Sequence, residues 1–413
     1  MAYESGDIAW MMISTALVMI MTPAVGFFYG GMLRKNSMLS MLGQTLIILG
    51  IVTLIWVVFG FSLSFGPDTA GLIGNFDFAF LNGVGVGAVT PDLVFFPTNI
   101  PPLLYMMFQG TFAIITVALI IGGIAERMRL AAVAVFLAIW TVIIYLPVAH
   151  WVWGGGWIFE LGALDFAGGT VVHITAGATV LAATLVIGKR ISAQHNQVDQ
   201  PHNIPFVVLG GALLWFGWFG FNGGSALGAN ETAVSAFVVT QIAAATAGVV
   251  WGLISYLHLG RTSVLGMITG AVVGLVAITP ASGFVDVFGA ITIGAIAPVF
   301  SYGAIQLRKR LGFDDALDVW GCHGIGGTVG AVATGFLASS AVNAAAPNGL
   351  LYGGGVDLLV KQLIAVGAVW GFVFVVVLAV MWIMVKIWPS WRMSKEEERI
   401  GADIVQHGEN AYA

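Results

Sequence analysis

Charged residues are scarce in this chain of 413 residues: Asp, Glu, Lys and Arg make up 8% of it, against about a quarter in typical soluble domains. Apolar residues make up 59%, and apolar runs of about 20 residues, long enough to span a bilayer, recur along the chain. These features exclude a soluble globular domain and indicate a protein that crosses a membrane many times. Cys322 is the only cysteine, so an internal disulfide is excluded. The net charge of −5 gives no indication of a nucleic-acid partner.

Apolar windows predict eleven membrane-spanning helices, in an all-α integral membrane protein. They cover residues 8–33, 40–63, 99–124, 130–150, 167–187, 205–225, 232–256, 264–283, 287–306, 317–338 and 358–388. With the N-terminus placed outside, every lysine and arginine of the 15 except Lys361 falls on the cytoplasmic side. This is the positive-inside bias, and it predicts an outside N-terminus and a cytoplasmic C-terminus. A signal-peptide pattern is not found, so the helix from Ile8 is expected to remain in the protein.

Five helices in each half, with one left over, are typical of transporters built from inverted repeats. We expect a membrane domain over residues 1–391, with the repeats at about 8–190 and 205–340 and the eleventh helix at 358–388. Residues 392–413 are expected to form a cytoplasmic tail. A charge run of this kind is also compatible with a solvated tail.

Two histidines, His173 and His323, lie in segments that are apolar and rich in glycine. An ionisable group at bilayer depth is costly, so each is a candidate functional residue. Small residues follow each histidine at helical spacing, for example Gly177 and Gly327, and would let another helix approach closely. Both helices are therefore expected in the middle of the bundle.

Asp165 and Asp318 precede these histidines by less than three helical turns. A carboxylate at a helix start accepts hydrogen bonds from free backbone N–H groups, and we expect this capping role for both. Asp165 would also lower the cost of bringing a cation into a nearby pathway. Cys322, beside His323, has no second cysteine or histidine cluster to accompany it, so neither a metal site nor a cofactor is expected.

Aromatic side chains gather at the predicted outer ends of helices. They lie in the motifs FQGTF, with Phe108 and Phe112; HWVWGGGW, with Trp151, Trp153 and Trp157; and WFGWFGFNGGS, with Trp215, Trp218, Phe219, Phe221 and Ser225. Such residues form interfacial belts in many membrane proteins. They can equally form a cation-binding vestibule, because an aromatic face attracts an ammonium-type cation by about 0.5 to 2 kcal/mol. The residues alone leave both interpretations open.

Longer motifs carry a resemblance to a known family. They include FFYGG from Phe27, DFAGGTVVH ending at His173, PVAHWVWGGGW, WFGFNGGS, DVWGCHGIGG around His323, and the tail EEERIGAD followed by HGENAY. Together with FQGTF they resemble the ammonium transporter family of Amt, Mep and Rhesus proteins, over essentially the whole chain and most closely the prokaryotic Amt proteins. Val180, Ile400 and Ala402 depart from the family's usual motifs.

The resemblance implies a homotrimer in the plasma membrane, with one pore for ammonium or ammonia in each subunit. Carried over by motif, Trp153, Phe112 and Ser225 would bind ammonium at an outer site that Asp165 supports. Phe112 and Phe221 would form a gate, His173 and His323 would line the pore, and Tyr145, Trp218 and Phe28 would line the vestibule or the pore. The tail would be regulatory and dock under neighbouring subunits, and a PII-type protein would bind the cytoplasmic mouth.

The expected mechanism follows from the cost of moving a charge into a dry pore. Dehydrating ammonium costs on the order of tens of kcal/mol, whereas deprotonating it near pH 7 costs about 3 kcal/mol, because its pKa is roughly 9. We therefore expect ammonia to pass along the histidines, with or without separate proton transfer.

The alternative is an ammonium sensor without substantial transport, which the short tail disfavours. A Rhesus-type gas channel is disfavoured by Trp153 and Ser225, and an enzyme by the lack of a recognisable nucleophile.

Overall fold

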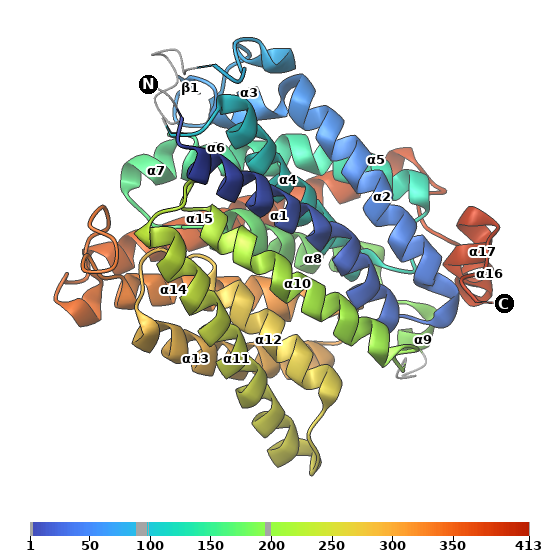
Figure 1. Cartoon of the computed structure of the whole chain (residues 1–413). Coiled ribbons are helices and arrows are strands. Elements are labelled where there is room, and N and C mark those ends of the chain that lie inside the picture. The colour runs from blue at the N-terminus through green and yellow to red at the C-terminus, as the bar shows by residue number, and fades with distance from the viewer. Residues whose placement is uncertain (1–2, 88–96, 98, 195–199, 413) are drawn as a thin grey trace.

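The computed structural model describes residues 3–87, 97, 99–194 and 200–412, and it is built almost entirely of helices (Figure 1). The first half contains α1 (Ser5–Met32), η1 (Lys35–Ser37), α2 (Met38–Ile55), η2 (Trp56–Gly60), α3 (Phe61–Phe65), η3 (Ala79–Leu81), α4 (Pro102–Ile124), α5 (Leu130–Trp140), η4 (Thr141–Tyr145), α6 (Leu146–Trp153), α7 (Trp157–Leu161), η5 (Gly169–Ile174), α8 (Thr175–Ile187) and α9 (Ile191–Gln194). The strands β1 (Asp68–Thr69) and β2 (Ile73–Gly74) pair antiparallel between α3 and η3.

The second half begins with the helix after the segment 195–199. It contains α10 (Ile204–Gly224), α11 (Glu231–Leu259), α12 (Val264–Ile278), α13 (Val287–Leu311), η6 (Trp320–Ile325), α14 (Gly326–Leu337), η7 (Leu350–Tyr352), α15 (Asp357–Ile387), α16 (Lys395–Ile400) and α17 (Ala402–His407).

Nine helical runs among the described residues are long and apolar enough to cross a membrane. Two of the predicted spans are not among the nine. One contains α12, which has 15 residues and is about 22 Å long at the usual rise. The other contains the run from Trp320 to Leu337, formed by η6 and α14. The prediction of a multi-pass, all-helical membrane protein is confirmed, whereas the count of eleven spans and their orientation stay predictions.

Glycines let helices touch in the middle of the bundle. Helices α1 and α10 lie side by side (Figure 1), and a Cβ atom on Gly210 would be 2.3 Å from the backbone nitrogen of Phe28. Where α8 meets η6, a Cβ atom on Gly177 would be 2.2 Å from the Cα atom of Gly324. Backbone atoms cannot give way as a flexible side chain can, so close packing of small residues holds these helices together.

In the described part of the chain, four helical segments are wound as π-helix, namely η2, η4, η5 and η6. Two of them carry the histidines of interest, because His173 lies in η5 and His323 in η6. Such widened turns are rare and occur frequently at functional sites. Both histidines are buried in the bundle, as predicted.

The C-terminal tail folds back onto its own chain, where α17 packs against α2 near the C-terminus in Figure 1. Asp403 accepts a hydrogen bond of 2.7 Å from the backbone of Ser40. Glu398 forms an ion pair of 2.8 Å with Arg392, and Asn36 donates to the carbonyl of Ile400. Glu398 and Asp403 are buried. The tail is therefore docked, and the solvated alternative is wrong.

Candidate functional site

Four of the predicted site residues line one cavity, here called the Trp153 pocket. Trp153 comes from the end of α6, Phe112 from α4, Ser225 from the end of α10, and Asp165 from the connection between α7 and η5. The pocket has a volume of about 380 Å³. Segments that are far apart in the sequence thus bring aromatic faces, a hydroxyl and a buried carboxyl together.

The polar groups of the Trp153 pocket have defined orientations. The indole Nε1 of Trp153 donates a hydrogen bond of 2.8 Å to the carbonyl of Asp165, which fixes the ring. The Ser225 hydroxyl donates to the carbonyl of Phe221 at 2.8 Å. Because its only hydrogen is used in this bond, the oxygen keeps lone pairs for accepting a hydrogen bond from a ligand.

Two phenyl rings connect the Trp153 pocket with the interior. Phe112 lies edge-on to Trp153, with ring centres 5.9 Å apart, and its ring centre is 4.4 Å from that of Phe221. Phe221 in turn stacks on the imidazole of His173 at 6.1 Å. Trp153, Phe112, Phe221 and His173 therefore form a continuous row.

His173 and His323 face each other in a narrow apolar cavity, here called the histidine chamber, which Phe28, Trp218 and Phe221 also line. The two Nδ1 atoms are 3.3 Å apart. The indole of Trp218 stacks on His173 at 5.5 Å and is itself held by its hydrogen bond of 2.8 Å to the Thr279 hydroxyl. Trp218 therefore supports the orientation of the His173 ring.

The contact between the histidines restricts their protons. A hydrogen bond between two Nδ1 atoms needs one ring that carries hydrogen on Nδ1 and one that does not. In neutral imidazoles, one Nε2 atom is then an acceptor and the other is a donor. The Nε2 atom of His173 is buried and has no hydrogen-bond partner among the described residues. The pair thus retains hydrogen-bonding capacity that the protein does not use.

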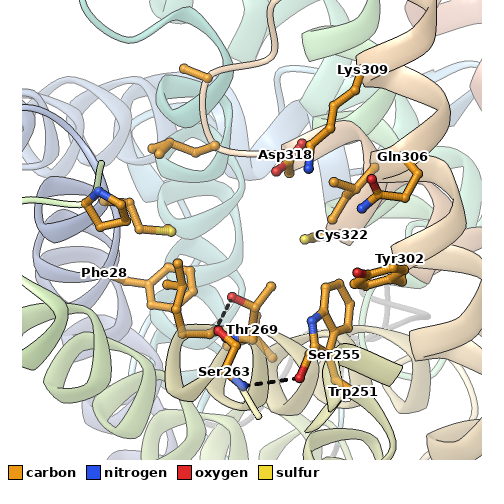
Figure 2. A pocket seen from close by; sticks show the side chains of 18 of the residues that line it. Phe28, Trp251, Ser255, Ser263, Thr269, Tyr302, Gln306, Lys309, Asp318 and Cys322 are labelled. Carbon is orange, nitrogen blue, oxygen red and sulfur yellow. Dashed lines mark hydrogen bonds between the residues drawn. The ribbon is translucent and has the colours of Figure 1, made fainter. Parts of the chain in front are cut away.

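A wider cavity, here called the Asp318 chamber, adjoins the histidine chamber (Figure 2). Its volume is about 350 Å³, and His323 and Phe28 line both cavities. Cys322, Tyr302, Gln306 and Lys309 are among the side chains drawn around it. The Trp153 pocket, the phenyl pair, the histidine chamber and the Asp318 chamber follow one another through the protein.

The capping role expected of Asp165 is present. Its carboxylate accepts hydrogen bonds from the backbone of Gly168, Gly169 and Thr170 at 2.7 to 2.8 Å, at the start of η5. Burial raises the pKa of this carboxyl, and the hydrogen bonds from Thr170 and the glycines act in the opposite direction. Asp165 therefore anchors the helix that carries His173.

The capping role expected of Asp318 is wrong. Asp315 accepts the hydrogen bond from the backbone of Trp320, at 2.7 Å, at the start of η6. Asp318 has a backbone φ of +57° and forms an ion pair of 2.6 Å with Arg308. Asp315 was not predicted, although Asp315 precedes His323 by eight residues, the same interval by which Asp165 precedes His173.

The first residue of the motif HWVWGGGW, His150, is buried and does not line any of the three cavities. The Nδ1 atom of His150 lies 3.0 Å from the carbonyl of Ser64, and its Nε2 atom lies 2.9 Å from the Asp68 carboxylate. The hydrogen bond from His150 holds the pKa of the Asp68 carboxyl below its usual range. A Cβ atom on Gly154 would be 2.0 Å from the Ser64 carbonyl, so this close packing requires glycine.

Three residues were predicted to line the vestibule or the pore, and two of them line a cavity. Phe28 and Trp218 line the histidine chamber. Tyr145 lies instead between Trp56 and Trp140, with ring centres 6.2 and 6.4 Å away, and is not among the side chains lining the three cavities. Tyr29 also lines both inner cavities, although it was not predicted. Its neighbour Phe28 in the FFYGG motif could have indicated it. Within the described ranges, no group of three or more His, Cys, Asp or Glu side chains is placed to hold a metal ion.

Comparison with known proteins identifies the family. The family model described as Ammonium Transporter Family matches residues 9–412. The chain belongs to this family. It is 46% identical to the ammonium transporter Amt1 of Archaeoglobus fulgidus, an alignment that covers 99% of this chain and 100% of the relative. It is 45% identical to the ammonium transporter of Bacillus subtilis, with 99% of each chain covered.

Solved structures of family members agree with the fold. The crystal structure of Mep2 from Saccharomyces cerevisiae matches with a TM-score of 0.88 and 34% identity, covering 95% of this chain and 91% of Mep2. Mep2 from Candida albicans matches with a TM-score of 0.88 and 35% identity, covering 99% of this chain and 91% of Mep2. The resemblance read from the motifs is thereby confirmed over nearly the whole length of this ammonium transporter family member.

Proposed function

We propose that this family member transports ammonium by binding it in the Trp153 pocket, deprotonating it, and conducting ammonia through the histidine chamber. The observation that carries the proposal is the row from Trp153 through Phe112 and Phe221 to His173, which ends at an Nε2 atom without a partner in the described protein. The chain's similarity to ammonium transporters supports the choice of substrate.

The Trp153 pocket has the chemistry of an ammonium site. The faces of Trp153 and Phe112 attract a cation by about 0.5 to 2 kcal/mol each. The Ser225 oxygen has free lone pairs, since its hydrogen is donated to Phe221, and it can accept one of the ammonium N–H bonds. The Asp165 carboxyl lines the same pocket and contributes negative charge when it is ionised.

The phenyl pair sets the chemical selectivity. Phe112 and Phe221 offer no hydrogen-bond acceptors, so an ion passing between them would lose hydration worth on the order of tens of kcal/mol. Loss of one proton costs about 3 kcal/mol near pH 7. Ammonium therefore crosses as ammonia, whereas potassium, which has no proton to lose, is excluded.

The histidine pair suits ammonia, which both donates and accepts hydrogen bonds. Because one Nε2 atom accepts and the other donates, the neutral pair matches the substrate without titrating. His173 and His323 thereby replace part of the hydration of ammonia inside an otherwise apolar chamber. The proton lost at the Trp153 pocket passes to water on that side, and ammonia takes up a proton from water once it has entered the Asp318 chamber. Separate transfer of the first proton through the protein is equally compatible with this route.

The charges indicate which end faces the cytoplasm. Arg34, Arg127, Arg190 and Arg392 lie with the docked tail on the connections at one end of the helices. From the positive-inside bias we infer that this end faces the cytoplasm and that the Trp153 pocket faces outside. Residues 1–391 are then the transport domain, with repeats at about 8–190 and 205–340, and residues 392–413 are a regulatory tail. We extend the proposal to a plasma-membrane homotrimer whose cytoplasmic mouth accepts a PII-type protein.

An ammonium sensor is the second candidate. A solved structure titled Sensor Amt Protein matches with a TM-score of 0.88 and 28% identity, covering 97% of this chain. The fold alone thus does not separate the two functions. The higher identity to proteins named ammonium transporters, 42 to 46%, favours transport.

Reconstitution of a double variant tests the proposal. His173→Ala together with His323→Ala should abolish ammonium uptake into vesicles, read from the internal pH, while the protein keeps the thermal stability of the wild type. Unchanged, ammonium-selective uptake by the folded double variant would overturn the role of the pair. Ammonium binding by a wild type that shows no uptake would favour the sensor.

A further inference from the structure

A single amide from α15 holds the loop at the edge of the Trp153 pocket. The Oε1 atom of Gln362 accepts a hydrogen bond of 2.6 Å from the backbone nitrogen of Leu164. Its Nε2 atom donates to the carbonyl of Leu164 at 2.8 Å and to the carbonyl of Ala331 at 2.9 Å. Gln362 is 1% exposed. Both N–H bonds and the oxygen of this amide are therefore used in one buried contact.

The loop held by Gln362 connects directly to the groups of the pocket. Leu164 lines the Trp153 pocket, and the next residue, Asp165, does so as well. The carbonyl of Asp165 orients the indole of Trp153, and its carboxylate caps η5. A shift of Leu164 would consequently move the acceptor that holds Trp153.

The contact also sets the position of the loop relative to the second half of the chain. Ala331 belongs to α14, which follows directly on η6 and its His323. Packing leaves little room for adjustment, since a Cβ atom on Gly335 would be 3.3 Å from the Cγ atom of Gln362. A three-point contact of this kind fixes the loop more firmly than one hydrogen bond does.

We infer that Gln362 is a positioning residue for substrate binding: its amide holds the Leu164 backbone so that Asp165 presents its carbonyl to Trp153. The inference rests on the proposed function, in which the Trp153 pocket binds ammonium. Gln362 itself does not line the pocket, so it acts through the loop and not on the substrate. Its loss should therefore weaken binding more than it slows passage through the histidine chamber.

The experiment compares ammonium uptake by reconstituted full-length variants over a range of ammonium concentrations. Gln362→Met keeps the size of the side chain and removes all three hydrogen bonds. It should raise the half-saturating ammonium concentration by about fivefold, which corresponds to the net contribution of roughly one hydrogen bond to binding. The maximal rate should stay within about twofold of that of the wild type. Lys361→Met, on the adjacent residue, is the matched control and should leave both values unchanged.

A second variant covers the case in which Gln362→Met does not fold. In Gln362→Glu, the ionised carboxylate still accepts from Leu164 but cannot donate, whereas the protonated acid also donates one hydrogen bond. Its half-saturating concentration, relative to the wild type at the same pH, should fall as the pH is lowered from 7.5 to 5.5. The nearby charged side chains Asp165, Asp357 and Lys361 are the same in both proteins, so the ratio to the wild type reports on the substitution at position 362. A half-saturating concentration equal to that of the wild type at both pH values would overturn the inference, because either form of the glutamate lacks at least one of the donated hydrogen bonds.

Trp153→Leu separates this inference from the proposed function. If Trp153→Leu and Gln362→Met both raise the half-saturating concentration, the positioning role is supported. If only Trp153→Leu raises it, the pocket binds ammonium and the inference about Gln362 is overturned. If neither changes it, the Trp153 pocket is not the binding site, and both proposals fail. A lower yield of folded protein with an unchanged half-saturating concentration would reduce Gln362 to a structural role.

Discussion

The Nδ1 atoms of His173 and His323 lie 3.3 Å apart, although 150 residues separate the two histidines in the sequence. Each histidine lies in a π-helical segment whose start is capped by a buried aspartate eight residues earlier, Asp165 in one half and Asp315 in the other. The two halves of the chain thus supply equivalent parts of the histidine chamber.

Removal of the Ser225 hydroxyl should weaken ammonium binding. Ser225→Ala removes an acceptor whose hydrogen bond to a charged ligand is worth about 1.5 to 3 kcal/mol, so the half-saturating ammonium concentration should rise about tenfold or more. The measurement is uptake by reconstituted protein over a range of concentrations. Ser225→Thr keeps a hydroxyl and serves as the control. Equal half-saturation in wild type and Ser225→Ala would remove Ser225 from the binding site.

A methyl group at Gly177 should destabilise the fold and displace the histidine pair. The Cβ atom of Gly177→Ala would lie 2.2 Å from the Cα atom of Gly324, next to His323. Overpacking typically costs about 1 to 3 kcal/mol, so the thermal unfolding temperature in detergent should fall and uptake should decrease. Gly367→Ala is the control, because a Cβ atom there meets nothing within 4 Å. An unchanged unfolding temperature in Gly177→Ala would contradict the observed helix contact.

Asp315 should make stability depend on pH. Burial and the charge of Asp318 raise the pKa of Asp315 to about 6, against the opposing effect of Arg308. A carboxyl whose pKa is higher in the folded than in the unfolded protein stabilises the fold fully below its ordinary pKa of about 4. This stabilisation is lost as the pH rises through about 6. The wild type should therefore lose up to about 2 to 3 kcal/mol between pH 4 and pH 7.5 from this group.

Asp315→Asn should remove that loss, because the amide oxygen still accepts the hydrogen bond from Trp320 and carries no charge. Thermal unfolding in detergent at pH 5 and pH 7.5 measures the difference. The unfolding temperature of Asp315→Asn should change less between the two pH values than that of the wild type, and Glu409→Gln, at an exposed position, should behave as the wild type does. An identical pH dependence in Asp315→Asn would show that another group is responsible.

Undocking of the tail should impair transport if the tail is regulatory. Asp403→Ala leaves the backbone nitrogen of Ser40 without its acceptor, which costs about 1 to 3 kcal/mol for a buried donor. Limited proteolysis should then cleave the chain within α16 or α17 faster than in the wild type, and uptake should decrease. Asp403→Asn keeps an acceptor and should retain both properties. Faster cleavage with wild-type uptake would separate docking from regulation.

The resemblance to the family predicted the members of the Trp153 pocket, whereas the residues alone left an interfacial belt equally open. Trp153, Phe112, Ser225 and Asp165 line one cavity, although Phe112 lies in the middle of α4. The spacing could also have identified Asp315, since the interval of eight residues repeats before both histidines.

Other features could not be predicted from the sequence. The position of Tyr145 between Trp56 and Trp140 depends on the rotation of an almost uniformly apolar helix, in which no polar face indicates the buried side. The contact of Gln362 with Leu164 joins residues 198 positions apart and leaves no local signal. The tail's docking depends in the same way on distant backbone groups, such as those of Ser40 and Ile400.

Selection of ammonium by deprotonation is tested by a direct comparison of ammonium and potassium. Wild-type protein in vesicles is exposed to a jump in ammonium or in potassium, while internal pH and electrical current are recorded together. If deprotonation selects ammonium, the ammonium jump should change the internal pH, with or without a current. The potassium jump should then give neither a pH change nor a current. A potassium current comparable to that of ammonium would show that ions pass the phenyl pair intact and would contradict the account.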